Sequence, residues 1–130
     1  MNYALRIDLE RPFDEAVRMI KESLAESGFG ILTEIDLKAT LKNKIDVDID
    51  DQIILGACNP RFAYRGLQAE PSLGLLLPCN VVIRHQAGVT VVETIDPETM
   101  VTLTGNPEME AVALEVRAGL KAALERVAAS

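Results

Sequence analysis

Histidine, cysteine and tryptophan are scarce in this sequence. Among its 130 residues there is one histidine, there are two cysteines, and there is no tryptophan. A zinc site normally takes cysteine and histidine ligands at short spacings, whereas Cys58 and Cys79 lie far apart without a CxxC motif. We therefore expect no bound metal and no cofactor. In a reducing compartment, two cysteines are expected to be free thiols rather than a structural disulfide.

Long apolar runs and dense basic clusters are also missing. No window approaches the roughly 18 consecutive apolar residues of a membrane-spanning helix. Charged residues between Arg6 and Arg11 interrupt the apolar run that a signal peptide needs. We therefore expect a cytoplasmic protein with no membrane partner. The 13 basic and 20 acidic residues give a formal net charge of −7, which repels phosphate backbones, so we expect no nucleic-acid partner.

What is present matches an ordinary folded domain. Hydrophobic residues make up 48% of the chain and charged residues 25%, which excludes a disordered protein. A chain of this length can bury one continuous core but not two. No internal repeat, linker or low-complexity segment occurs. The sequence therefore predicts a single domain over residues 1–130.

Hydrophobic periodicity predicts strands and helices that are intermixed along the chain. Period-two alternation predicts strands over residues 3–9 and 29–35, and the sequence predicts long amphipathic helices over residues 12–27 and 107–127. The shorter elements expected between them are a helix at 38–45, a strand at 52–58, a helix at 60–70, an apolar turn at 73–77, a hairpin of strands at 79–86 and 89–95, and an extended segment at 98–104. This order favours an α+β fold in which a small, mostly antiparallel sheet is covered by two long helices plus short helices. The lone histidine, His85, alternates with Ile83 and is expected to face inward.

Two Cys-Asn motifs are the sharpest chemical feature. Cys58-Asn59-Pro60 ends a predicted strand where a helix begins, with Asn59 as a helix cap. A thiol at a helix N-terminus is near free N–H groups and the positive end of the helix dipole, which stabilise a thiolate. Cys79-Asn80 opens another strand, and neighbouring strands would bring both thiols to one edge of the sheet. The alternative is structural, because buried cysteine commonly acts as a small hydrophobic residue.

A second candidate site is a group of charged residues. Glu34 and Asp36 are two apart in a predicted strand and therefore project from the same face. Lys38 follows on the next helix, and Asp96 could close the same site. Such a group could hold a small polar ligand, or it could be a surface ion-pair network in which Asp36 caps the helix and Asp96-Pro97 ends a strand.

Four stretches together resemble the domain of unknown function 302 family. They are GFGILTEIDLKATLK at 28–42, ILGACNP at 54–60, LGLLLPCNVVI at 73–83 and TIDP at 94–97. The resemblance covers essentially the whole chain. It implies a β-α-β(4)-α fold related in architecture to the TATA-binding-protein-like class, and a homodimer. It implies no reaction, so whether the chain is an enzyme stays open.

Three hypotheses follow from these features. In the first, the chain is a non-catalytic small-ligand-binding or homodimeric assembly module, and Glu34, Asp36, Lys38, Cys58, Asn59, Cys79, Asn80 and Asp96 form a polar site around the Cys-Asn motifs. In the second, it is a thiol-dependent redox enzyme or sensor, with Cys58 as the thiolate and Cys79 as the resolving partner. That requires the two Cα atoms to lie within about 7 Å. In the third, both motifs are core and cap residues without a ligand.

Overall fold

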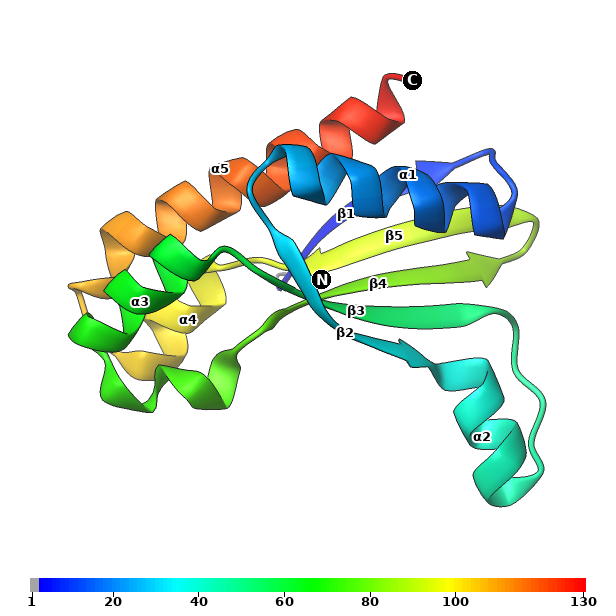
Figure 1. The fold of residues 1–130 in the computed structure, drawn as a ribbon, viewed down its shortest axis with the longest axis horizontal. Helices are drawn as coiled ribbons and strands as arrows, with labels where there is room; N and C mark the ends of the chain where they lie inside the picture. Colours follow the sequence, from blue (N-terminus) through cyan, green and yellow to red (C-terminus); the bar gives the residue numbers. More distant parts are fainter. Residues whose placement is uncertain (1–2) are drawn as a thin grey trace.

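The computed structural model describes residues 3–130 and is built on a five-stranded antiparallel sheet (Figure 1). The strand order across the sheet is β1-β5-β4-β3-β2, so both central pairs join strands that are consecutive in the chain. The strands are β1 (Ala4–Leu9), β2 (Gly30–Asp36), β3 (Gln52–Cys58), β4 (Cys79–Gln86) and β5 (Val89–Ile95).

The two long helices lie side by side on the same face of this sheet, as Figure 1 shows. They are α1 (Phe13–Glu26) and α5 (Met109–Ala128), and α1 lies beside the C-terminal part of α5 (Figure 1). The shorter helices are α2 (Leu37–Ile45), α3 (Pro60–Ala69), the 3-10 helix η1 (Pro71–Leu76) and α4 (Glu98–Thr104). With the short helices set aside, the order is β-α-β(4)-α, which confirms the predicted α+β fold.

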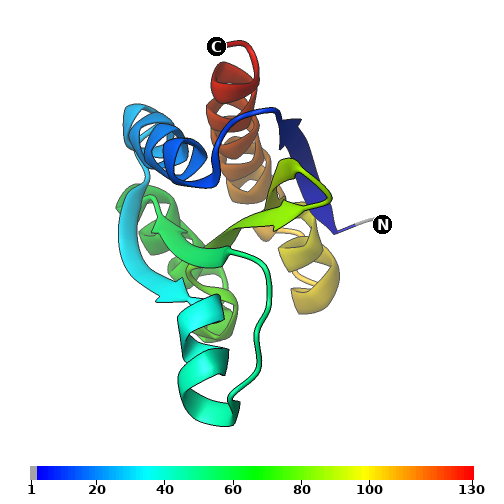
Figure 2. The same cartoon turned by 90° about the vertical axis from the view of Figure 1, so that its right-hand side faces the viewer.

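Strand register explains why one face of the sheet is buried. The row Glu34, Leu55, Val81, Thr94 and Leu5 runs across all five strands on the helix-covered face, and its three central side chains are buried. The adjacent row points to the opposite face. Its members are Ile35, Ile54, Val82, Glu93 and Arg6, and none of them is fully buried. No helix of residues 3–130 packs over the centre of that second face (Figure 2).

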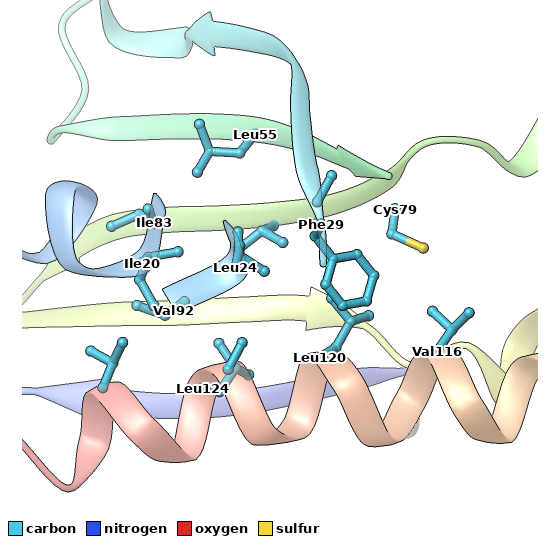
Figure 3. Packing of buried hydrophobic residues seen from close by; sticks show 14 of the residues in the cluster. Ile20, Leu24, Phe29, Leu55, Cys79, Ile83, Val92, Val116, Leu120 and Leu124 are labelled. Atoms are coloured by element: carbon cyan, nitrogen blue, oxygen red, sulfur yellow. The ribbon is translucent and has the colours of Figure 1, made fainter. Parts of the chain in front are cut away.

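The core forms where the apolar stripes of α1 and α5 meet the sheet. Figure 3 shows Ile20 and Leu24 of α1 facing Leu120 and Leu124 of α5 above the central strands. Phe29 enters the same layer from the turn before β2 and is 2% exposed. Burying a large apolar side chain contributes about 1.5–3 kcal/mol, so this layer dominates the stability of the fold.

Two turns have the backbone conformations that their residues predict. Gly28 ends α1 in a left-handed conformation with φ of 84°, which an L side chain rarely adopts. The β4–β5 hairpin turns at Ala87 and Gly88, whose φ values are 49° and 82°. Positive φ at both central positions is typical of a two-residue type I′ hairpin.

Residues 98–104 are helical, so the extended segment predicted there is wrong. Their β-branched residues favour a strand locally, but Asp96 initiates a helix instead. The Asp96 carboxylate accepts a hydrogen bond from the Glu98 N–H at 3.0 Å, and the Asp96 carbonyl accepts one from the Thr99 N–H at 2.9 Å. Burial of Met100 against the core then holds α4 in place. In residues 98–104, tertiary packing has therefore overridden the local preference for a strand.

Three further expectations need adjustment. His85 lies on the helix-covered face, but its side chain is exposed. The period-two pattern of β2 is interrupted by a register shift between Ile31 and Thr33. The last helix starts at Met109, although Asn106 still caps its entry by accepting a hydrogen bond from the Glu108 N–H at 2.9 Å.

Helix α2 projects away from the body of the protein (Figures 1 and 2). It contacts only its flanking strands β2 and β3 to any extent, and none of its residues is buried. Ile45 at its end is 63% exposed, and Leu32 in the preceding strand is 65% exposed. A nine-residue helix is marginal without packing, so this arm is stabilised mainly by its caps at Asp36 and Asp46.

Candidate functional site

The two cysteines border one small cavity where the ends of β3 and β4 meet α3, α4 and α5. The cavity has a volume of about 30 Å³, which is enough for one or two water-sized groups. Its wall is apolar. The residues around it are Phe29, Ala57, Cys58, Asn59, Phe62, Ala63, Leu73, Leu77, Cys79, Met100, Met109, Val112, Ala113 and Val116.

The junction of β3 and α3 positions Cys58 and Asn59. Asn59 is the N-cap of α3, as predicted, and its Oδ1 accepts hydrogen bonds from the N–H groups of Arg61 (3.1 Å) and Phe62 (3.5 Å). Pro60 has no N–H to satisfy. Gly28 passes so close to this cap that a Cβ there would lie 3.0 Å from Asn59 Nδ2. The capping amide therefore occupies the N–H groups that might otherwise have stabilised a Cys58 thiolate.

Cys79 and Asn80 point to opposite faces of the sheet. Cys79 is 5% exposed and pairs in register with Ala57, the neighbour of Cys58. Figure 3 shows its side chain beside Phe29 and Val116 in the core layer. Asn80 is exposed on the face without helices. The sheet thus brings Cys58, Asn59 and Cys79 together and separates Asn80 from them.

Both thiols are harder to ionise than a free cysteine. Burial raises the pKa of Cys58, and it raises the pKa of Cys79 to about 11, with the charge of Cys58 as a smaller cause. Desolvation disfavours the charged thiolate. The lowered thiolate pKa considered for Cys58 is therefore wrong. The charge of Cys58 raises the pKa of Cys79 because both residues border the same cavity.

The charged candidates lie away from this cavity and have other partners. Glu34 and Asp36 do project from one face, as predicted, because their register partners are Leu55 and Ile53. Glu34 forms an ion pair with Lys21 of α1. Asp36 caps α2 by accepting a hydrogen bond from the Ala39 N–H at 3.0 Å.

Lys38 and Asp96 also have other partners. Lys38 Nζ lies 3.7 Å from an Asp51 carboxylate oxygen in the loop before β3. Asp96 caps α4 and accepts a hydrogen bond from Arg117 Nε of α5 at 3.2 Å. The eight candidates therefore do not form one polar pocket in the described part of the chain, and their role in ligand binding stays a prediction.

Sequence reasoning missed the residues that make up most of the cavity wall. Met100 and Met109 are 6% and 1% exposed, and Phe62 closes the cavity from α3. The only signal in the sequence was their place in apolar stripes, which is shared with every core residue. Apolar periodicity identifies a buried face but says nothing about where packing leaves a gap.

Two possible features are absent from residues 3–130. No group of three or more histidine, cysteine, aspartate or glutamate side chains is arranged to hold a metal ion. No helix in this range has the length and apolar character needed to cross a membrane.

Comparison with known proteins places the chain in a family. The family model described as "Domain of unknown function DUF302" matches residues 5–127. None of the curated proteins matches significantly. The chain is similar to the crystal structure of an uncharacterized conserved protein DUF302 from Bacillus stearothermophilus, at 27% identity and a TM-score of 0.91, with 97% of this chain and 98% of that chain covered. The chain therefore belongs to the DUF302 family of domains of unknown function.

Proposed function

We propose that this domain is a non-catalytic binding module whose small-ligand site is the cavity between Cys58, Asn59 and Cys79. The observation that carries the proposal is the convergence of Cys58, Asn59 and Cys79 on one preformed cavity. Small-molecule sites are typically concave, mostly apolar and provided with a few polar groups. Here the polar groups are the two thiols and the Asn59 amide, whose position the α3 cap fixes.

The surroundings of the cavity favour binding over catalysis. The described residues that line it include no carboxylate, ammonium or imidazole group. General acid–base catalysis needs a titratable group poised near the working pH. The raised pKa values leave both thiols protonated at neutral pH, so neither is an activated nucleophile.

Filling the cavity tests this site. Ala113 on α5 borders the cavity and is 1% exposed, whereas Ala111 on the same helix is exposed. In the wild type, dissolved xenon should give saturable amide chemical-shift changes around Phe62. Ala113→Leu should abolish these changes and the matched control Ala111→Leu should retain them. Saturable binding by a folded Ala113→Leu variant, or none by the wild type, would contradict the proposal.

The α2 arm supports homodimeric assembly as a second proposal. Ile35 and Ile45 are large apolar side chains that are 45% and 63% exposed, Ile35 on the sheet face that no helix covers and Ile45 at the end of α2. Exposed apolar groups that form a contiguous patch commonly mark an interface. A second copy of the chain, seated on this face, would bury them with two-fold symmetry.

Sedimentation velocity across a dilution series tests this assembly. The wild type should sediment as a dimer and Ile35→Lys as a monomer. Leu114→Lys is the control, since Leu114 is 52% exposed on α5, away from the arm. A wild type that remains monomeric at every concentration would exclude the homodimer.

The thiol-dependent alternative makes a different prediction. Its support is that Cys58 and Cys79 border the same cavity. Alkylation of the native protein by iodoacetamide, followed by mass spectrometry across pH, measures the reactivity of each thiol. An apparent pKa well below about 8.5 for Cys58 would favour the redox alternative. We expect slow reaction at neutral pH instead, and a reducing cytoplasmic location would keep both thiols free.

A further inference from the structure

Most of the sulfur in this protein surrounds the cavity. The chain has two cysteines and four methionines. Four of these six residues, Cys58, Cys79, Met100 and Met109, border the cavity. They come from four different elements, the end of β3, the start of β4, α4 and the first turn of α5. Only the fold brings them together.

The sulfur-bearing side chains are held in place by their surroundings. Cys79, Met100 and Met109 are at most 6% exposed, and all three belong to the continuous core. The Met109 Cε atom lies 3.7 Å from the position that a Cβ would take at Gly66, so Met109 packs directly on α3. Cys58 is half-buried and is therefore the more accessible of the two cysteines.

The size and chemistry of the cavity point to one class of ligand. A volume of about 30 Å³ suits an ion better than an organic molecule. Thiolate and thioether sulfur are soft donors that select Cu(I), zinc and iron–sulfur clusters among the biological metals. Zinc instead favours four cysteine, histidine or carboxylate ligands, and the described lining residues include only two of these, both cysteines.

We propose that the cavity binds one Cu(I) ion through the thiolates of Cys58 and Cys79, with thioether sulfur from Met100 and Met109 completing the ligand set. This inference rests on the proposed binding site and names the ligand class. On binding, two S–H bonds break, two Cu–S bonds form, and two protons go to solvent while copper stays Cu(I). The resulting centre carries a net charge of −1.

Competition with the Cu(I) chelator bicinchoninate, under anaerobic conditions and on the full chain, tests the site. The wild type should withdraw one equivalent of copper, and X-ray absorption should show only sulfur neighbours. Cys58→Ser and Cys79→Ala should each weaken binding by at least about tenfold, a loss that removal of even a supporting partner of a metal ligand can cause. Met100→Leu should weaken it as well. Met19→Leu is the matched control, because Met19 lies on α1 outside the cavity lining.

Several results would overturn the copper site. They are a wild type that takes no copper from the chelator, nitrogen or oxygen neighbours alone in the absorption spectrum, or equal losses in Met19→Leu and Met100→Leu. The absorption measurement on the wild type decides the question even if a cysteine variant fails to fold. Xenon binding without copper binding would refute the copper site and keep the proposed ligand site. Absence of both xenon and copper binding would refute both proposals.

Discussion

Raising the pH from 8 to 10.5 should destabilise the wild-type protein more than a Cys79→Ala variant. Burial raises the pKa of Cys79 from 9.0 to about 11 in the folded protein, whereas unfolding exposes the thiol and restores its ordinary pKa. The folded state therefore binds the proton more tightly. The stability that this contributes is fully present below pH 9 and is lost as the pH rises towards 11, because the unfolded chain then ionises first.

The size of the effect follows from the shift. One pKa unit corresponds to about 1.4 kcal/mol, so the raised pKa of Cys79 makes the wild type roughly 2 kcal/mol less stable at pH 10.5 than at pH 8. Lysines and tyrosines also titrate in this range, but they are common to both proteins. The difference between wild type and variant isolates the thiol.

Urea denaturation with a reductant present, at pH 8, 9.5 and 10.5, gives the free energy of unfolding at each pH. The packing that is lost in Cys79→Ala lowers the free energy of unfolding by the same amount at all three pH values. The substitution should also remove most of the extra loss of stability that the wild type shows between pH 8 and pH 10.5. Cys58→Ala should retain most of it, because Cys58 is only half-buried. Parallel losses in the wild type and Cys79→Ala would show that Cys79 ionises normally in the folded protein, and the reasoning about its burial would be refuted.

Three further substitutions test the local structure around the site and the hairpin. Asn59→Ala should lower the free energy of unfolding by about 1 kcal/mol, because two N–H groups of α3 lose their acceptor, and Asn59→Asp should retain most of the stability in urea titrations. Gly119→Ala should be destabilising despite a gain of roughly 1 kcal/mol in helix propensity, because the new Cβ would lie 2.9 Å from Phe29 Cε2. An increase in melting temperature would show that the Phe29 ring moves aside without loss of stability. Ala87→Asn should raise stability by roughly 0.5 kcal/mol, because Ala87 has a φ of 49° that asparagine tolerates better, and an unchanged or lower melting temperature would contradict this.

Much of the fold was predictable because its signals are local. The stripe of α1, its end at Gly28 and the cap at Asn59 each depend on residues within a few positions of one another. The same holds for the hairpin at Ala87-Gly88, where the turn itself requires positive φ. Residues 98–104 were mispredicted because their state depends on burial of Met100 in a distant core.

The candidate site was only partly predictable. The sequence identified Cys58, Asn59 and Cys79, and strand pairing then placed both thiols on one cavity. It could not show that Glu34 pairs with Lys21 or that Asp96 pairs with Arg117, because those partners come from other helices.

The amino-acid sequence by itself determined the order of the elements, their buried faces, the caps and the family. Tertiary structure alone decided that methionines of α4 and α5 join the cysteines around one cavity, and that burial raises the pKa of both thiols. The physical reason is that these interactions act over different distances along the chain. Backbone hydrogen bonding and hydrophobic periodicity act over a few residues, whereas cavities and desolvation arise from contacts between segments that are distant in the chain.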